Sequence, residues 1–458
     1  MPEFSFPDGF LWGVATSAQQ IEGGAGEDGR GESIWDRFAA EPGRIADGSN
    51  PGVACDHFHL WREDVARLRW LGVGAYRFSI AWPRIIPDGR GEPNPAGLDF
   101  YDRLVDALLA AGIRPFVTLY HWDLPQPLQD RGGWGARETA EAFTAYAGVV
   151  SARLGDRVKH WTTHNEPWCI AILGHEAGEQ APGHRDPAEA LRVAHHVLLS
   201  HGWAAEAVRR HSPGSEVGIV QIHSPVTPAT SSEADRDAER RFDGAFNRWY
   251  LDPVFRGEYP SDAVADRVRR GHLASPELPF VRDGDMRAIA TPIDFLGLNY
   301  YSRTVVRADA AGEPVSVPRG TDRERTDMGW EVYPQGLHDA LLRVTRDYAP
   351  RKLYVTENGA AYTDPSDATG RIADSRRIEY LHLHLESARR AIADGVPLCG
   401  YFAWSMLDNF EWSHGYAKRF GLFDVDFNTQ RRRPRDSAHW FRLVVAARAV
   451  NDLAPQAL

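Results

Sequence analysis

The chain has 458 residues, of which 43% are hydrophobic, 25% charged and 11% aromatic. This composition excludes a collagen-like, disordered or disulfide-scaffold protein, because glycine shows no period of three and only three cysteines occur. A net charge of -11 argues against nucleic acid and anionic membrane surfaces as partners.

Short apolar runs rich in β-branched and aromatic residues alternate with longer amphipathic segments along the chain. This alternation is typical of parallel strands joined by crossover helices. In chain order, eight strands are predicted, at residues 10–16, 75–82, 114–121, 160–166, 217–223, 295–301, 353–357 and 398–404. Clear helical patterns follow most of them, at residues 56–71, 95–111, 138–154, 187–210 and 374–394.

Eight such units without a break in composition predict an α/β fold, a single (β/α)8 TIM barrel that forms one catalytic domain over residues 1–458. The residues beyond the ~250 of a simple barrel are assigned to long loops. The largest are expected at residues 22–54, 303–332 and 408–430, each after a strand. They would lie at the C-terminal face, where such barrels carry their chemistry.

The sequence also supports expectations about location and partners. Residues 1–5 show no basic region followed by an apolar stretch, and no window approaches the ~18 apolar residues that span a bilayer. We therefore expect a cytoplasmic protein without a membrane partner, and the oligomeric state stays open. Cys55, Cys169 and Cys399 are predicted to be reduced thiols buried as small hydrophobes. The arginines between residues 431 and 435 are predicted to form a solvated face.

Polar residues stand near the predicted C-terminal ends of the strands. Such residues either point into the mouth of a barrel or need a buried partner. In chain order they are Gln20, Arg77, His121 with Trp122, Asn165 with Glu166, His223, Asn299 with Tyr301, Glu357 with Asn358, and Trp404. Two of them are carboxylates, on the fourth and seventh strands, and their tips can converge across the mouth of a closed barrel.

Paired carboxylates at Glu166 and Glu357 suggest glycoside hydrolysis, which needs one protonated carboxyl group and one ionised carboxylate. The alternative for either residue is a structural ion pair. Nearby aromatic residues favour catalysis, because aromatic faces suit the apolar C–H face of a sugar. Six tryptophans fall at or near the predicted mouth: Trp12, Trp122, Trp168, Trp330, Trp404 and Trp412.

The 18 histidines do not predict a metal site. Three close pairs occur: His57 with His59, His195 with His196, and His382 with His384. None has the i, i+4 spacing that places two rings on one helix face, so surface or packing roles are expected. No organic cofactor is expected either, because carboxyl groups can handle each proton and bond of glycoside hydrolysis.

Short motifs along nearly the whole chain carry a family resemblance. In order they are Phe10-Leu11-Trp12-Gly13, Gln20-Ile21-Glu22-Gly23, Tyr76-Arg77-Phe78-Ser79, Thr163 to Pro167, Asn299-Tyr300-Tyr301, Thr356-Glu357-Asn358-Gly359, Trp404-Ser405 and Phe410-Glu411-Trp412. Together they resemble the motifs of glycoside hydrolase family 1, the retaining β-glucosidases and their relatives.

The resemblance implies Glu166 as acid/base and Glu357 as nucleophile of a two-step reaction with net retention, their carboxyl groups ~5 to 5.5 Å apart. It also implies Arg77 and Tyr301 beside Glu357, where a cation and a hydrogen-bond donor favour the ionised form. The implied substrate-binding set is Gln20, His121, Trp122, Asn165, Asn299, Tyr301, Trp330, Trp404, Glu411 and Trp412. Asn165 would hold the sugar 2-hydroxyl, and Trp404 would be the platform beneath the ring.

Two positions depart from the family pattern. His164 stands where an apolar residue is usual, and a charged imidazole beside the acid/base would change the pH profile. A neutral, packed histidine is the favoured interpretation of this position. Gln19 stands where an aromatic residue is common, and little consequence is expected.

The sequence thus predicts a retaining exo-acting β-glycosidase, with β-glucosidase as the main prediction and the breakdown of cellulose and other carbohydrates as the expected setting. Its partner would be a small-molecule β-glycoside. The alternatives are a 6-phospho-β-glycosidase, a non-catalytic sugar-binding barrel and a transglycosylase. Glu411 argues against a phosphorylated sugar, because a carboxylate repels a dianion, although Lys418 and Arg419 follow it. The preference among glucose, galactose and fucose stays open.

Overall fold

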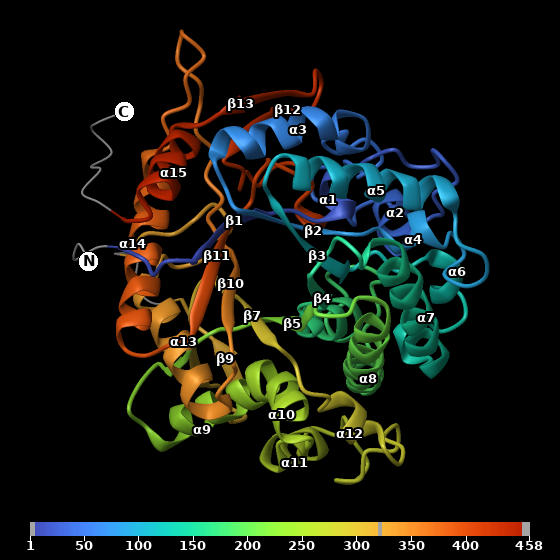
Figure 1. The fold of residues 1–458 in the computed structure, drawn as a ribbon. Coiled ribbons are helices and arrows are strands. Elements are labelled where there is room, and N and C mark those ends of the chain that lie inside the picture. The colour runs from blue at the N-terminus through green and yellow to red at the C-terminus, as the bar shows by residue number, and fades with distance from the viewer. Residues whose placement is uncertain (1–4, 319–322, 451–458) are drawn as a thin grey trace.

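The computed structural model describes residues 5–318 and 323–450. Its centre is a closed barrel of eight parallel strands (Figure 1). They are β1 (Leu11–Ala15), β2 (Ala75–Ser79), β3 (Arg114–Tyr120), β4 (His160–Asn165), β5 (Glu216–Ile222), β7 (Phe295–Asn299), β10 (Leu353–Asn358) and β11 (Leu398–Trp404). Each barrel strand pairs with the next one along the chain, and β1 pairs with β11 to close the barrel. The predicted (β/α)8 fold is confirmed.

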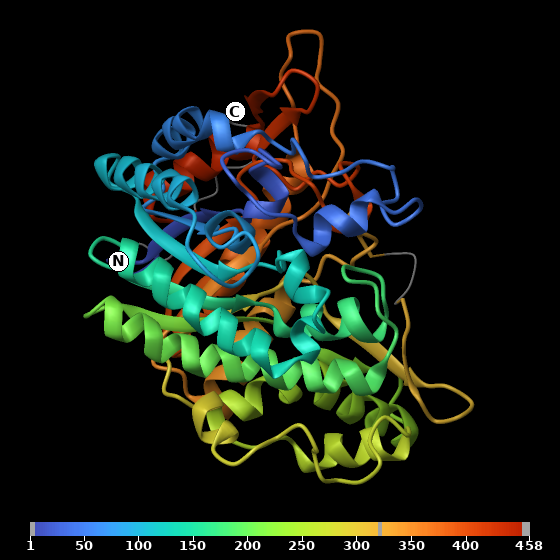
Figure 2. The same ribbon diagram turned by 90° about the vertical axis from the view of Figure 1, so that its right-hand side faces the viewer.

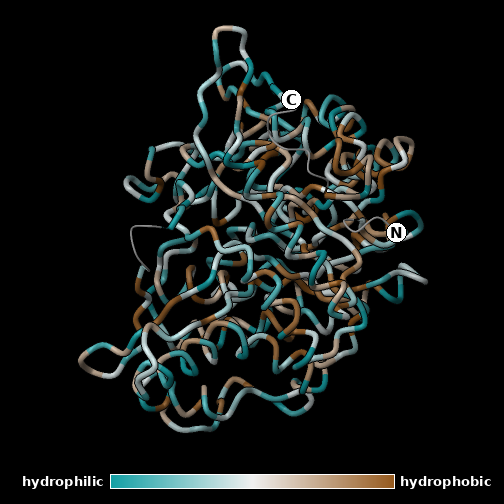
Figure 3. The backbone as a smooth tube through the Cα atoms, turned by 90° about the vertical axis from the view of Figure 1, so that its left-hand side faces the viewer, coloured by the Kyte–Doolittle hydropathy of each residue, from teal (hydrophilic) through white to brown (hydrophobic). Residues whose placement is uncertain are grey.

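Helices surround the barrel (Figure 1). The long ones are α3 (His57–Leu71), α5 (Pro95–Ala110), α7 (Arg137–Leu154), α8 (Pro187–His211), α13 (Pro334–Tyr348), α14 (Ser375–Ala393) and α15 (Asp436–Ala447). The connection from β5 to β7 contains α9 (Glu233–Asp243), α10 (Trp249–Arg256), α11 (Ser261–Arg269) and α12 (Asp285–Ile289). Hydropathy alternates along the helices (Figure 3), as expected when one stripe of each helix packs on the barrel.

Shorter elements occupy the loops. The helical turns are α1 (Ala18–Ile21), α2 (Ile34–Ala40), α4 (Trp82–Ile85), α6 (Gln126–Gln129), η1 (Gly133–Gly135), η2 (Cys169–Glu176), η3 (Gly244–Arg248) and η4 (Trp412–His414). One small sheet contains β6 (Val226–Pro228), β8 (Thr304–Ala308) and β9 (Pro314–Ser316), and another pairs β12 (Phe423–Asp426) with β13 (Arg431–Pro434). The hairpin of β8 and β9 projects from the molecule (Figure 2). Residues 319–322 of the predicted loop at 303–332 lie outside the described residues.

Aromatic side chains fill the inside of the barrel beneath the ends of its strands. The ring of Phe116 lies with its centroid 5.2 Å from that of Phe295, 5.3 Å from Tyr354 and 5.0 Å from Phe402. Each of these four residues precedes the polar end of its own strand. The barrel is therefore a packed core at this level, and a ligand can enter only at the C-terminal mouth.

Trp12 does not lie at that mouth, so the prediction that placed it there is wrong. Successive side chains of a strand point to opposite faces, and Leu11 and Ala15 of β1 belong to the cluster inside the barrel. Trp12 consequently points outward. Its ring centroid lies 4.8 Å from that of Phe6 and 6.2 Å from that of Phe441, which belongs to α15.

The arginines at 431–435 do not form a uniformly solvated face, and the prediction is wrong for two of them. Arg432 is buried and donates hydrogen bonds to Asp64 of α3. Arg435 is also buried and donates to both carboxylate oxygens of Asp408, at 3.0 and 2.7 Å. Alternation along β13 turns Arg432 inward, and charge pairing makes the burial of both residues tolerable.

Other predictions have mixed outcomes. Cys55 and Cys169 are buried as predicted, but Cys399 is only half-buried.

Among the described residues, no helix is long and apolar enough to cross a membrane. The two described ends meet where Ser5 bridges to Ala449. Residues 1–4 and 451–458 of the predicted single domain lie outside the described residues, and a single domain stays a prediction.

Candidate active site

A cavity of about 620 Å³ opens among the loops that follow the barrel strands. Ten residues of the predicted site line it: His121, Trp122, Asn165, Glu166, Tyr301, Trp330, Glu357, Trp404, Glu411 and Trp412. The other three, Gln20, Arg77 and Asn299, are fully buried and do not line the cavity. The barrel thus gathers side chains that are up to several hundred residues apart in the sequence.

Irregular backbone at the strand ends positions these side chains. The pairing register shifts between Thr162 and Asn165 of β4 and between Val355 and Glu357 of β10. Glu166 itself has a φ of 50°, in the left-handed region that residues other than glycine rarely adopt. Such conformations cost free energy and persist where the surrounding structure enforces them, as they often do at functional sites.

Two donors hold the carboxylate of Glu357. Arg77 of β2 donates to its Oε1 at 2.5 Å, and the hydroxyl of Tyr301 donates to its Oε2 at 2.6 Å. Arg77 also donates to the side-chain oxygen of Asn165 at 2.6 Å. Both carboxylate oxygens are therefore oriented, one of them by a buried cation.

Glu166 has neutral donors instead. The amide of Asn299 donates to its Oε1 at 2.7 Å, and the thiol of Cys169 donates to its Oε2 at 3.1 Å. Burial and the charge of Glu357 raise the pKa of Glu166 to about 8, although both hydrogen bonds oppose the shift. At neutral pH this carboxyl group is consequently protonated, as a general acid must be.

His121 is set up to donate a hydrogen bond into the cavity. Its Nε2 lies 3.1 Å from the side-chain amide nitrogen of Asn165, which donates to it, so the ring proton is on Nδ1. Burial and the charge of Arg77 lower the pKa of His121 well below its ordinary value. The Nδ1–H has no hydrogen-bond partner among the described residues, which leaves it available to a ligand.

Glu411 provides a third carboxyl group. Its Oε2 is buried without a hydrogen-bond partner in the described part of the chain. Burial and the charges of Glu357 and Glu166 raise the pKa of Glu411 to about 8. Gln20 supports the segment that carries it, because its amide donates to the carbonyl of Phe410 at 3.0 Å. A ligand with several hydroxyl groups would satisfy this oxygen.

Aromatic rings form the walls. Trp122 and Trp412 pack with ring centroids 4.5 Å apart, and Trp330 packs against Tyr301 at 5.2 Å. Trp404 stands at the end of β11. Flat apolar walls beside convergent polar groups suit a ligand with both C–H faces and hydroxyl edges.

The cavity lining also includes residues without an assigned binding role in the sequence prediction, among them Cys169, His223 and Phe246. Trp168, predicted at the mouth and beside the aglycone, lines the cavity, and Phe246, in η3, contacts it with ring centroids 4.4 Å apart. Phe246 does not stand at the end of a barrel strand, so the position of the strand ends could not predict it. Cys169 could have been found, because a residue three positions after Glu166 in a helical turn lies on the same side as it.

His164 is packed rather than exposed to the cavity. It is fully buried, its Nε2 lies 2.8 Å from the hydroxyl of Ser200, and its ring packs against Phe143 at 4.4 Å. Burial, with the neighbouring His201, lowers its pKa well below the ordinary value. The favoured interpretation of a neutral, packed histidine is therefore the one that the structure supports.

The chain is similar to known glycosidases over almost its full length. Residues 3–450 match the family described as glycosyl hydrolase family 1. Beta-glucosidase A of Acetivibrio thermocellus is 46% identical over 448 residues, covering 97% of this chain and 99% of that protein. A bifunctional beta-D-glucosidase/beta-D-fucosidase of Bifidobacterium breve is 44% identical, covering 96% and 98%.

The chain is also similar to solved structures of β-glucosidases over almost its full length. The family 1 β-glucosidase from Thermotoga maritima has a TM-score of 0.94 at 46% identity, covering 99% of this chain and 100% of that one. A β-glucosidase from the same organism in complex with glucoimidazole has a TM-score of 0.93 at 46% identity, covering 97% and 99%.

Proposed function

The chain belongs to glycosyl hydrolase family 1 and is a retaining glycoside hydrolase, and from this premise we propose that it is a β-glucosidase whose catalytic pair is Glu166 and Glu357. Its substrates would be small β-glycosides with a terminal non-reducing β-D-glucosyl residue. The observation that carries the assignment is the contrast between the two carboxyl groups. Glu357 is held by a buried cation, whereas Glu166 receives only neutral donors.

In the first step, Glu357 attacks the anomeric carbon while Glu166 gives its proton to the leaving oxygen. The carbon–oxygen bond to the aglycone breaks as the bond to Glu357 forms, which inverts the anomeric centre. The raised pKa of Glu166 keeps the proton available at neutral pH.

In the second step, Glu166 takes a proton from water, which displaces Glu357 and inverts the centre again. The charge of Glu357 is one of the causes that raise the pKa of Glu166. Esterification removes that charge, so the pKa of Glu166 falls when it must act as a base. The change of role follows from the reaction itself.

We propose that the neutral sugar is recognised by the Nδ1–H of His121, the amide of Asn165 and the carboxyl group of Glu411, above the ring of Trp404. The buried carboxyl group of Glu411 can exchange hydrogen bonds with sugar hydroxyl groups, whereas a phosphate dianion at this position would lie near the charge of Glu357. Trp168, Phe246 and His223 lie further along the cavity wall and would face the aglycone.

The test is release of aryl alcohol from β-glucoside, β-galactoside, β-fucoside and 6-phospho-β-glucoside substrates by wild type and Glu357→Ala. Wild type should hydrolyse the unphosphorylated glucoside, and the variant should lose at least ~10⁴-fold in turnover. Azide should restore turnover of the variant and give the α-glucosyl azide, since it attacks the vacated face. Glu206→Ala, on the exposed side of α8, is the control and should match wild type.

Two results would reject the proposal. Full turnover by Glu357→Ala would remove the nucleophile assignment, and turnover of the phosphorylated sugar alone would overturn the role of Glu411. Absence of turnover by wild type would instead favour a non-catalytic sugar-binding protein. The ratio of hydrolysis to transglycosylation can be read from the products formed when a second sugar is added.

The cytoplasmic location and a role in cellulose degradation stay proposals. Their support is a set of three free cysteines, with Cys55 and Cys169 buried, and relatives from Thermotoga neapolitana named 1,4-beta-D-glucan glucohydrolase. Cell fractionation and growth on cellobiose would test the two proposals separately.

A further inference from the structure

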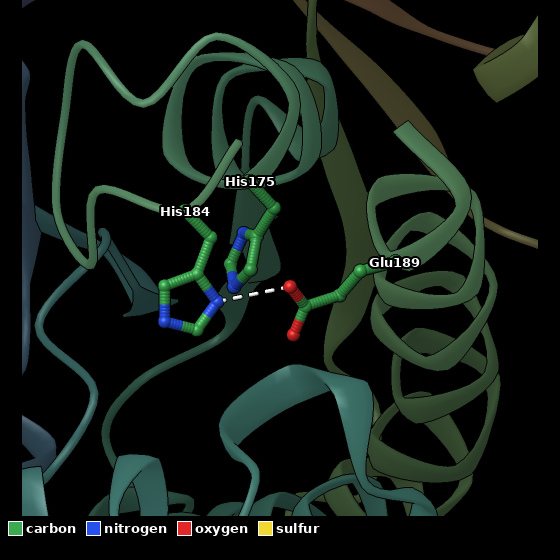
Figure 4. A group of neighbouring side chains, drawn as sticks. All are labelled: His175, His184 and Glu189. Atoms are coloured by element: carbon green, nitrogen blue, oxygen red, sulfur yellow. Dashed lines mark hydrogen bonds and ion pairs between the residues drawn. The ribbon is translucent and has the colours of Figure 1, made fainter. Parts of the chain in front are cut away.

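A group of three side chains that can act as metal ligands lies apart from Glu166 and Glu357. His175 lies in the last turn of η2, His184 stands in the following loop, and Glu189 lies in the first turn of α8 (Figure 4). One potential ligand atom from each lies within 4.8 Å of the others. Figure 4 shows the three side chains pointing toward one another from these separate elements.

His175 presents a buried lone pair to this group. Its side chain is about 1% exposed, and its Nδ1 lies 2.8 Å from the carbonyl oxygen of Ile170. A carbonyl only accepts, so Nδ1 carries the proton and Nε2 carries the lone pair. Nε2 has no hydrogen-bond partner among the described residues. Burial lowers the pKa of His175 to about 4, which keeps the ring neutral.

His184 and Glu189 complete a set of two imidazoles and a carboxylate. Nδ1 of His184 lies 2.9 Å from Oε2 of Glu189, so the pair is already oriented. Their side chains are 40% and 17% exposed, which leaves a path for an ion and a water ligand. The charge of Arg192 disfavours a second positive charge at His175. The carboxylate of Glu189 favours a positive charge there and so opposes the effect of Arg192.

We propose that His175, His184 and Glu189 bind a divalent transition-metal ion of the zinc class. Two histidines and a glutamate with one open position form a known type of zinc site. The hydrogen bond from Nδ1 of His175 to a backbone carbonyl is the outer contact that usually orients a metal-bound histidine. Zinc–ligand bonds of ~2.1 Å place donors about 3.4 Å apart, so separations of up to 4.8 Å must shorten by as much as about 1.4 Å, while the His184–Glu189 pair at 2.9 Å must open slightly. His184, on a loop, is the residue placed to move.

The ion would fix the position of a loop that lines the catalytic cavity. Residues 177–186 connect η2 to α8, and Glu179 and Gln180 of this segment line the cavity. Coordination replaces the proton between His184 and Glu189 with a bond from each residue to the metal, and the displaced proton moves through solvent to Nε2 of His184. The loop is then tied to α8 and, through His175, to the turn that follows Glu166.

The test uses the full chain after treatment with a chelator and removal of that chelator. Titration calorimetry with ZnCl₂ should give one ion per chain, while MgCl₂ should give no saturable binding, because Mg²⁺ prefers oxygen ligands. The variants His184→Ala and Glu189→Gln should each weaken zinc binding at least ~10-fold. His211→Ala, an exposed histidine at the far end of α8, should bind zinc as wild type does.

Thermal unfolding supplies a second readout that is independent of catalysis. The midpoint of wild type and of His211→Ala should rise with zinc concentration, and the midpoints of the two ligand variants should not. Zinc binding of equal affinity in His184→Ala would place the ion elsewhere, for instance at the carboxyl groups of the cavity, and would overturn the proposal. Absence of stoichiometric binding by wild type would also overturn it, whatever the glycosidase assays show.

Discussion

Glu166 and Glu357 are the same residue type in one cavity, and their neighbours make them chemically different. A guanidinium and a phenol contact Glu357, whereas an amide and a thiol contact Glu166. A buried cation favours the ionised form of a carboxyl group, and neutral donors do so less strongly. At the scale of single residues, the proposed roles of Glu166 as acid and Glu357 as nucleophile therefore depend on a few contacts, which substitutions can test separately.

Replacing Glu166 with Ala should affect substrates according to their leaving groups. A dinitrophenyl glucoside needs no proton to depart, so its kcat/KM should stay within about tenfold of wild type. An alkyl glucoside should lose ~10²- to 10⁴-fold, the usual contribution of a general acid. Comparison of kcat/KM across a leaving-group series checks this. Equal losses across the series would contradict an acid role for Glu166.

Cys169→Ala should move the basic limb of the kcat/KM profile to higher pH. The thiol donates to Glu166 and lowers its pKa, so removing the thiol raises the pH at which the acid loses its proton. Cys169→Ser, which keeps a donor, should restore the limb. Cys399→Ala is the control, a half-buried thiol on β11. An unchanged limb in Cys169→Ala would show that the thiol only fills space.

The candidate site was predictable from the sequence where its residues follow barrel strands. His121, Glu166 and Glu357 were expected at the mouth because parallel strands end together at one face, and all three line the cavity. The roles that the family motifs gave them stay predictions. Phe246 was not found, because it comes from a helical turn in the long connection from β5 to β7. The group of His175, His184 and Glu189 was also missed. These residues come together only because the loop at 177–186 folds back, and no sequence period indicates that fold.

At the scale of elements, alternation along the strands determines what the inside of the barrel can hold. The predicted strands and long helices were correct to within a few residues, because their periods of two and 3.6 persist over whole segments. Trp12 was assigned to the wrong face, since a motif near a strand end does not tell which side each residue takes. The inward orientation of Arg432 in β13 was missed for the same reason.

Gly13→Ala should destabilise the barrel. A Cβ at Gly13 would stand 2.3 Å from a ring carbon of Phe402, whose ring packs against Phe116 and cannot move freely. Overpacking of this kind costs about 1 to 3 kcal/mol, so the thermal midpoint should fall. Gly74→Ala is the control, because its Cβ would meet only ordinary contacts, the nearest 3.6 Å away.

A second substitution tests the cause. In Gly13→Ala/Phe402→Leu, the smaller side chain makes room for the added methyl group. Gly13→Ala should therefore cost less stability in the Phe402→Leu background than it costs in wild type. Additive losses of the two changes would indicate that the methyl group does not act through Phe402.

At the scale of the whole molecule, buried ion pairs hold the segment that carries β13 and the start of α15 against other parts of the chain. Arg432 of β13 pairs with Asp64 of α3, and Arg435, just before α15, pairs with Asp408 in the loop after β11. Asp408 also accepts the backbone N–H of Gly421 at 2.8 Å. The loop that carries Glu411 is thus fixed to the C-terminal helix by charges that water does not reach.

Asp408→Asn should therefore lower the thermal midpoint, because buried Arg435 loses its nearer counter-charge and keeps only Asp424, at 3.4 Å. The cost should reach at most about 3 to 5 kcal/mol, the value for a fully unpaired buried charge. Burial favours the neutral acid, but the charges of Arg435 and Arg419 outweigh it and lower the pKa of Asp408 below its ordinary 3.8. The stabilisation is consequently complete above pH ~3.8 and disappears as the pH falls through the lower pKa of the folded state.

The difference in midpoint between wild type and Asp408→Asn should be largest near pH 7 and should shrink as the pH drops below ~3.8, because the wild-type carboxylate then becomes protonated as well. Thermal unfolding at a series of pH values measures this. Asp106→Asn, which breaks a pair between an exposed carboxylate and Arg157, should change the midpoint little at any pH. A difference for Asp408→Asn that is independent of pH would mean that lost packing, rather than lost charge, destabilises the variant.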